Sequence, residues 1–149
     1  MQKSERGVNL EQGEAITLFA SGVRTATAGT NGTAVAILGE RLSYTFILDV
    51  TAAATEITDT LDVYIDTLFG TATWINCAHF TQVLGNGGVK SFFTVIVPTS
   101  MTTTDAVTTD CAAGVARGVV GSQFRGRYVE VDGGGAASSF TFSLTGYAL

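Results

Sequence analysis

Few side chains in this chain carry groups that could do chemistry, and the first of them are Cys77 and His79. His79 is the only histidine, and both residues lie two positions apart in the segment Trp74–Phe80. Alternate residues of a strand point to one face, so this spacing favours a thiol beside an imidazole. A metal site would need two further ligands, and a Cys–His nucleophile a third orienting group. We therefore expect a histidine packed in a sheet, and no catalytic, cofactor-binding or metal-binding residue.

A pair of carboxylates, Asp62 and Asp66, is the second candidate. Both alternate with apolar residues in Leu61–Asp66 and share a strand face with Tyr64. Paired carboxylates can act as acid and base or bind calcium. The same alternation is typical of the solvated face of a half-buried strand. We expect a solvated pair, with calcium bridging between subunits as the alternative.

Three further features suggest chemistry only weakly. The glycine cluster Gly133–Gly135 lacks the following Lys-Ser/Thr of a phosphate-binding loop. Trp74 and Tyr64 could stack on a sugar, although aromatic residues in strands more often serve a core or an interface. Cys77 and Cys111 are expected to be buried thiols, with a disulfide as the alternative, because nothing indicates an oxidising compartment.

Composition indicates a protein that binds other proteins. Charged residues make up 14% of the 149 residues and apolar residues 46%, whereas an average globular protein is about a quarter charged. Thr, Ser, Gly and Ala replace the missing charges. Such a surface is weakly hydrated, so we expect a partner to cover much of it.

Charge and hydropathy patterns argue against nucleic acid and membrane partners. The net charge is −5, and the only lysines are Lys3 and Lys90. Binding to phosphates needs clustered positive charge, which is absent beyond Arg125 and Arg127. The longest nearly apolar run is Phe92–Val97, whereas a membrane-spanning helix needs about twenty residues. The N-terminus also lacks the apolar stretch of a secretory signal.

The elements that must position these residues are predicted to be strands. Period-2 alternation of apolar and polar residues predicts strands at Glu14–Ala20, Val23–Thr27, Ala34–Leu38, Tyr44–Thr51, Leu61–Asp66, Trp74–Val83, Val89–Val97, Phe124–Val131 and Ser138–Leu144. Two glycine clusters, Gly85–Gly88 and Asp132–Gly135, predict β-hairpin turns. The segment Thr99–Val120 is ambiguous between a loop and a short helix capped by Thr104.

Many short strands without a long helix predict an all-β fold. We expect one domain over residues 14–149, an antiparallel β-sandwich or barrel of the jelly-roll type. Its predicted core contains Phe46, Leu48, Val63, Ile65, Phe140 and Phe142. Residues 1–13 show no sustained period and are expected to form an extended N-terminal arm. The arm residues expected to bind a partner are Gln2, Lys3, Arg6, Val8 and Leu10.

Several segments together resemble a family of small all-β structural virion proteins of tailed bacteriophages, of the head decoration or cement type. These segments are Glu14–Thr27, with its Ile-Thr-Leu-Phe-Ala-Ser core, Tyr44–Ala52, with Leu-Asp-Val-Thr-Ala, Leu61–Ile65, Phe124–Val129 and Ser138–Leu144, with Ser-Phe-Thr-Phe-Ser-Leu. They follow one another in the order of that family. The chain departs from it before the arginine-containing strand, where Val119-Val-Gly-Ser stands in place of Leu-Pro.

The resemblance implies a non-enzymatic protein of the virion. Cement proteins of this type bind the outside of the head, contact the major capsid protein and form trimers, often with an N-terminal arm that reaches a neighbour. The expected partners are therefore the major capsid protein and further copies of this chain. The expected location is the outer capsid surface, after synthesis in the host cytoplasm. The alternatives are a tail or head–tail connection protein, or a carbohydrate-binding β module.

Overall fold

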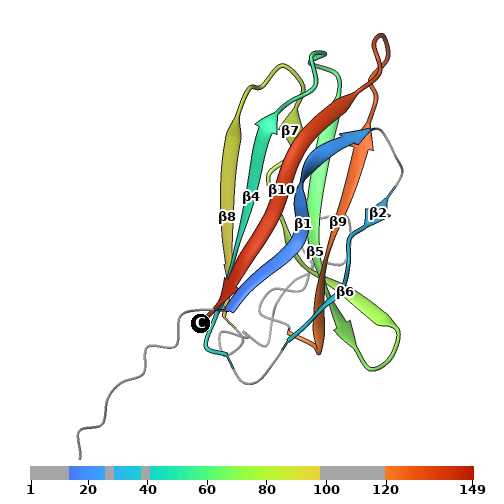
Figure 1. Cartoon of the computed structure of the whole chain (residues 1–149). Helices are drawn as coiled ribbons and strands as arrows, with labels where there is room; N and C mark the ends of the chain where they lie inside the picture. The colour runs from blue at the N-terminus through green and yellow to red at the C-terminus, as the bar shows by residue number, and fades with distance from the viewer. Residues whose placement is uncertain (1–13, 26–28, 38–40, 98–119) are drawn as a thin grey trace, which may run out of the picture.

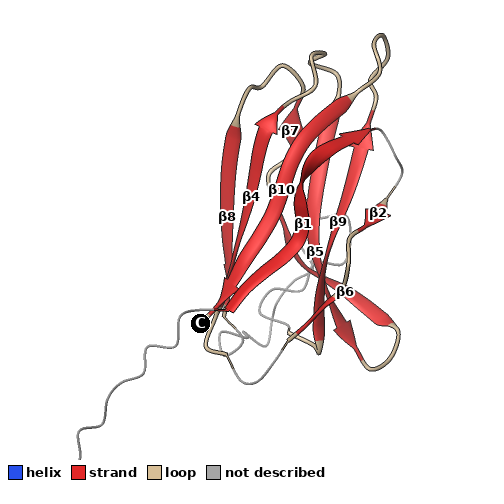
Figure 2. Ribbon diagram, in the orientation of Figure 1, coloured by secondary structure: helices blue, strands red, loops and turns tan. Residues whose placement is uncertain are grey.

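The computed structural model describes residues 14–25, 29–37, 41–97 and 120–149. Every regular element in these ranges is a β-strand, and the strands form two antiparallel sheets packed face to face (Figures 1 and 2). The predicted all-β sandwich is thus confirmed. The predicted arm over residues 1–13, the possible helix after Thr104, and Cys111 lie outside the described residues. No helix capable of crossing a membrane occurs in the described ranges.

The front layer in Figure 1 is a four-stranded sheet. Its order is β1 (Glu14–Thr25), β10 (Ser139–Ala148), β4 (Tyr44–Ala52) and β8 (Lys90–Ile96). The first and last strands in the sequence are therefore neighbours, with Glu14 opposite Ala148. Two register shifts in β1, between Thr17 and Phe19 and between Phe19 and Gly22, interrupt its pairing with β10.

The second layer is a six-stranded sheet built around β9 and β5. Its main path is β2 (Thr30–Asn31), β9 (Gln123–Val131), β5 (Thr60–Phe69) and β6 (Thr73–His79), while β3 (Val35–Ala36) also pairs with β9 and β7 (Val83–Leu84) also pairs with β5. A register shift between Ile65 and Asp66 gives β6 an additional residue at Cys77. Cys77 is a buried free thiol that donates a hydrogen bond to the Ile65 carbonyl at 3.3 Å.

The core lies between the sheets and is rich in aromatic rings. Phe19, Tyr128 and Phe142 meet edge to face, with ring centroids 5.5–5.7 Å apart, a favourable arrangement of aromatic quadrupoles. Gly126 makes room for this cluster, because a Cβ there would lie 2.5 Å from the Phe19 ring. All six residues predicted for the core are at most 1% exposed, namely Phe46, Leu48, Val63, Ile65, Phe140 and Phe142.

Both predicted glycine hairpins are wrong, because these loops connect the two sheets. The loop at Gly85–Gly88 leads from β7, which pairs with β5, to β8, which pairs with β4. The loop at Asp132–Gly135 leads from β9 to β10, which lie in opposite sheets. Glycine permits a tight change of direction, but it does not decide whether the next strand continues the same sheet or crosses the core.

Three crossover loops gather at one end of the sandwich, the upper end in Figure 1: residues 53–59, 85–89 and 132–138. Asp59, in the first loop, accepts a hydrogen bond from each of the other two loops. Its carbonyl accepts a hydrogen bond from Gly85 N at 2.8 Å, and its side chain accepts one from Gly133 N at 2.9 Å. Glu56 Oε1 accepts another from Ala136 N at 2.6 Å. Because each bond satisfies a loop amide, the acidic side chains here act as structural acceptors.

Candidate functional site

The outer face of the six-stranded sheet carries an alternating series of charged and aromatic side chains. Asp66 on β5 lies opposite Arg125 on β9 and Asn76 on β6. Arg125 places Nε and Nη2 each 3.2 Å from Asp66 Oδ2. Its guanidinium also lies 4.1 Å from the centre of the Trp74 ring. One arginine thus connects a carboxylate and an aromatic face, which holds all three side chains in place.

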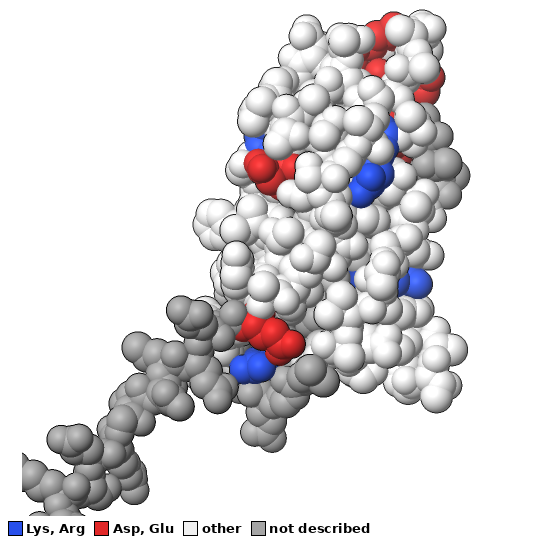
Figure 3. Space-filling view, viewed as in Figure 1, with Lys and Arg blue, Asp and Glu red and all other residues white. Residues whose placement is uncertain are grey.

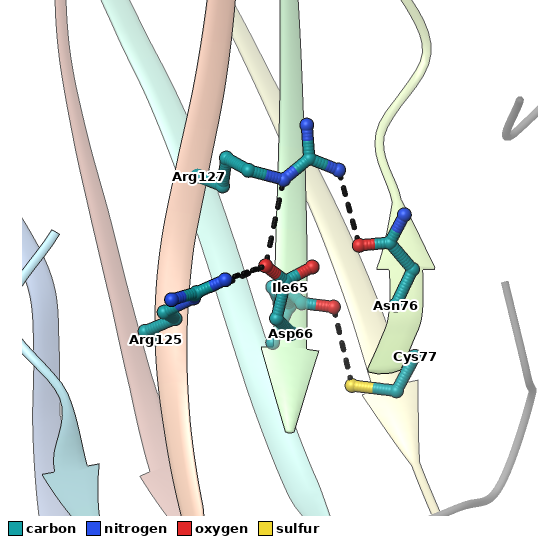
Figure 4. A network of polar contacts seen from close by, with 6 residues as sticks. All are labelled: Ile65, Asp66, Asn76, Cys77, Arg125 and Arg127. Atoms are coloured by element: carbon teal, nitrogen blue, oxygen red, sulfur yellow. Dashed lines mark hydrogen bonds and ion pairs between the residues drawn. The ribbon is translucent and has the colours of Figure 1, made fainter. Parts of the chain in front are cut away.

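Arg127, two residues further along β9, also lies between Asp66 and an aromatic ring (Figure 4). Its Nε lies 3.4 Å from Asp66 Oδ2, and its Nη2 donates a hydrogen bond to Asn76 Oδ1 at 3.1 Å. Its guanidinium covers one face of Tyr64 at 4.0 Å. His79 stacks with Tyr64, with the ring centres 4.3 Å apart. Arg125 and Arg127 therefore share the single carboxylate of Asp66.

The series ends at Asp62, which accepts a hydrogen bond from Gln82 Nε2 at 2.9 Å and lies 3.0 Å from His79 Nε2. Burial alone would raise the pKa of the Asp62 carboxyl. The hydrogen bonds from His79 and Gln82 outweigh burial, and the pKa is lowered. We call the whole set the polar ladder; its members are Asp62, Tyr64, Asp66, Trp74, Asn76, His79, Gln82, Arg125 and Arg127.

The structure corrects one prediction about these residues. The expectation of a solvated carboxylate pair is wrong for Asp66, which is 2% exposed because two arginines and their aromatic partners surround it. Asp62 and Asp66 also have separate partners. Within the described ranges, no group of three or more His, Cys, Asp or Glu side chains is arranged to hold a metal ion.

His79 is a packed histidine in a sheet, as predicted. It stacks on Tyr64 and lies next to Asp62, whereas Cys77 bonds to the main chain of β5. Burial raises the pKa of the Cys77 thiol far above its usual range, so the nucleophilic thiolate is disfavoured. Tyr64 is buried between Arg127 and the stacked His79 ring, so it offers no open stacking surface to a sugar. Arg125 lies against one face of Trp74.

The outer face of the four-stranded sheet, on the opposite side of the sandwich, is mostly apolar. Its middle consists of two cross-strand rows, Tyr147–Thr45–Val95 and Thr145–Ile47–Phe93. Phe93 is 76% exposed, and Val95 and Tyr147 are each 48% exposed. We call these six residues the apolar face. Figure 3 shows no charged side chain in the middle of this face, with charges confined to its margins.

Sequence reasoning did not single out the apolar face, although a signal for it exists. In β8 the pairs Phe92–Phe93 and Val95–Ile96 are consecutive apolar residues. Because neighbours in a strand point to opposite faces, such pairs supply one side chain to the core and one to the outside. Ile96 is 3% exposed and faces the core, whereas Val95 faces outward. The residues proposed from sequence for partner binding, in the arm over 1–13, lie outside the described ranges.

No family model, no curated protein and no solved structure matches this chain.

A buried carboxyl at the crossover end, Glu130, makes stability depend on pH. Ser138 Oγ donates a hydrogen bond to Glu130 Oε1 at 2.8 Å, and Oε2 has no hydrogen-bond partner. Burial raises the pKa of this carboxyl above its usual 4.5, and the nearby carboxylates of Asp59 and Asp132 add to the effect, against the opposing Ser138 bond. The native state therefore binds this proton more tightly than the unfolded chain.

We expect Glu130→Gln to gain stability relative to the parent protein as pH rises. The contribution of Glu130 is fully present below its unfolded pKa and is lost as pH rises through the raised native pKa. Glutamine is neutral at every pH and keeps an oxygen for Ser138. Urea unfolding between pH 4 and 7 measures the difference. Asp62 titrates in a separate window, because its lowered pKa stabilises the fold above its usual 3.8 and that contribution is lost only as pH falls below this value. A difference that shrinks as pH rises would contradict the expectation.

Proposed function

We propose that this protein is a non-enzymatic structural component of a tailed-phage virion, namely a cement protein on the outside of the head. In this role it would bind the major capsid protein and stabilise contacts between capsid subunits. The observation that carries the proposal is the apolar face, a charge-poor patch on the outer face of the four-stranded antiparallel sheet. The segments that resemble small virion proteins, Glu14–Thr27 and Ser138–Leu144 among them, supply the particular context.

The apolar face has the properties of a docking surface. Its large side chains are held on three adjacent strands, β10, β4 and β8, so binding requires little ordering of the backbone. Burial of the exposed Phe93 side chain stabilises a complex by roughly 1.5–3 kcal/mol before the costs of association. Ile47, which is 36% exposed, adds a smaller area. Threonines between them add hydroxyls that can bond across an interface without the cost of burying a charge.

The polar ladder supports a structural role more than catalysis. Each of its carboxylates has polar partners: Asp66 pairs with Arg125 and Arg127, and Asp62 bonds to His79 and Gln82. A general acid or base needs a titratable group that can reach a substrate, whereas Asp66 is 3% exposed at its side chain. The buried Tyr64 ring, covered by Arg127 and His79, likewise favours the virion role over a carbohydrate-binding module.

The proposal is tested with a matched pair of substitutions, Ile47→Asp and Ile57→Asp. Ile47 lies in the apolar face, while Ile57 is 69% exposed on the crossover loop 53–59. Binding to undecorated capsids should fall by at least about tenfold for Ile47→Asp, because a charge would be buried in the interface. The Ile57 variant should bind like the parent. Equal binding by both variants, with folding intact by circular dichroism, would refute the role of the apolar face.

A tail or head–tail connection protein is the alternative within the virion class. Copy number on purified particles separates the two roles, because a cement protein approaches the major capsid protein in stoichiometry and a tail part is present in few copies. Trimer formation is an expectation from the resemblance. Light scattering of the free protein, followed by a map of the decorated head, tests the trimer and the position on the capsid.

A further inference from the structure

Two asparagines in this chain are followed by glycine and are exposed, Asn31 before Gly32 and Asn86 before Gly87. In such pairs the backbone nitrogen of the glycine can attack the asparagine side chain, because glycine has no Cβ to hinder the approach. From their different surroundings we infer that Asn86 is a site of spontaneous deamidation in the folded protein and that the fold protects Asn31. This inference is independent of the proposed function.

The reaction needs only water as a co-reactant. The Gly87 amide nitrogen loses its proton and bonds to Asn86 Cγ, and the side-chain nitrogen leaves as ammonia. The resulting succinimide contains the former Gly87 nitrogen and both carbonyl carbons of the asparagine. Water then opens the ring at one carbonyl or the other, which gives aspartate or isoaspartate. No oxidation or reduction occurs.

The surroundings of Asn86 permit this ring closure. Asn86 lies in the turn between β7 and β8, with a φ of 56°, and both it and Gly87 are exposed. The Asn86 amide donates a hydrogen bond to the Ala54 carbonyl at 2.5 Å, which holds one side of the turn. The attacking group, the Gly87 amide, follows the turn at Gly85–Asn86 and does not pair with a neighbouring strand. Ring closure at Asn86 therefore breaks no hydrogen bond between strands.

The surroundings of Asn31 oppose the same reaction. Asn31 belongs to β2 and lies opposite Arg127 on β9. The Gly32 amide, which would have to attack, donates a hydrogen bond to the Gly126 carbonyl at 2.8 Å. Gly32 is also closely packed, since a Cβ there would lie 2.6 Å from the Leu18 carbonyl oxygen. Ring closure at Asn31 must first release Gly32 from the sheet, so it requires local unfolding.

Deamidation at Asn86 would change the crossover that leads into β8. It adds one negative charge to a chain of net charge −5, close to Lys90, whose Cε lies 3.2 Å from the place of a Gly87 Cβ. Isoaspartate also adds a methylene group to the main chain beside the Asn86–Ala54 hydrogen bond. Strand β8 carries Phe93 and Val95 of the apolar face, so a deamidated molecule would have an altered charge and backbone just before the start of this strand at Lys90.

The test is peptide mapping by mass spectrometry after the full-length protein is incubated in mildly alkaline buffer. In the folded protein, Asn86 should be modified at least about tenfold faster than Asn31, a ratio that needs a local opening cost of only about 1.4 kcal/mol at Asn31. In concentrated urea the two rates should become similar, because both sites are then Asn–Gly pairs in an unfolded chain. Enzymatic methylation of isoaspartate would locate the product independently.

The variant Asn86→Ser provides the matched control. It should abolish the fast reaction and leave the slow reaction at Asn31 unchanged, with the fold intact by circular dichroism. Equal rates at the two sites in the folded protein, faster reaction at Asn31, or no reaction at Asn86 while the urea sample reacts would each overturn the inference.

Discussion

Asp66→Asn is expected to lower the free energy of unfolding by about 3 kcal/mol, near the lower end of the cost of breaking a buried ion pair. The substitution keeps the shape of the side chain, removes its charge and replaces one acceptor oxygen with an NH2 donor. Arg125 and Arg127 would then face each other across a neutral amide, with no carboxylate between them. The loss stays near the lower end because the arginine side chains, 19% and 23% exposed, retain some contact with water.

Asp49→Asn is the matched control for this experiment, since Asp49 lies on β4 at the outer face of the other sheet. Asp49 Oδ1 accepts a hydrogen bond from Ser91 Oγ at 2.6 Å, and an amide oxygen can accept the same bond. Its cost should be below about 1 kcal/mol. Urea unfolding curves of both variants, compared at one pH and salt concentration, give the two values. Similar losses for the two variants would show that the arginines do not depend on the Asp66 charge.

Phe142→Ala is expected to have the largest effect of any single truncation discussed, about 3–5 kcal/mol of unfolding free energy. Phe142 is fully buried and contacts the rings of Phe19 and Tyr128 edge to face. Alanine would leave a cavity between the sheets, because the antiparallel pairing of β10 with both β1 and β4 fixes the backbone there.

Phe93→Ala separates burial from residue type, because Phe93 is 76% exposed on the same sheet. Its unfolding free energy should change by less than about 0.5 kcal/mol, while binding to undecorated capsids should weaken under the proposed function. Thermal or urea unfolding of both variants checks the stabilities. A comparable loss of stability in both variants would mean that Phe93 is buried by contacts in solution, for example between copies of the chain.

Local sequence patterns predicted most of the long strands and, in β4, the direction of the side chains. They failed at Trp74–Val83, which forms β6 and β7. They also failed at Cys77, which lies in the core while His79 stacks on Tyr64. In β4, Phe46 and Leu48 face the core and Ile47 faces outward, as the period of two requires. The same information did not predict which strands are neighbours. Glycines at 85–88 and 132–135 allow the chain to turn in either case, and the choice between the same sheet and the opposite one depends on residues far away in the chain.

The polar ladder escaped prediction for a similar reason. Asp66 and Arg125 lie 59 positions apart in the sequence, and only the pairing of β5 with β9 brings them together. Alternation in Leu61–Asp66 correctly placed Asp66 on the outer face. It could not show that the neighbouring strand supplies two arginines there, which convert a solvated position into a buried one.

The position of β10 between β1 and β4 has a consequence for the order of folding. Glu14 in β1 pairs with Ala148 in β10, so this ladder joins segments that are far apart in the sequence. The four-stranded sheet therefore lacks an inner strand until that long-range contact forms. Pairing over such long sequence separations is slow, because loop closure precedes the gain from contacts. We expect β10 to join this layer late in refolding, so that Phe46 and Leu48 stay exposed until it does.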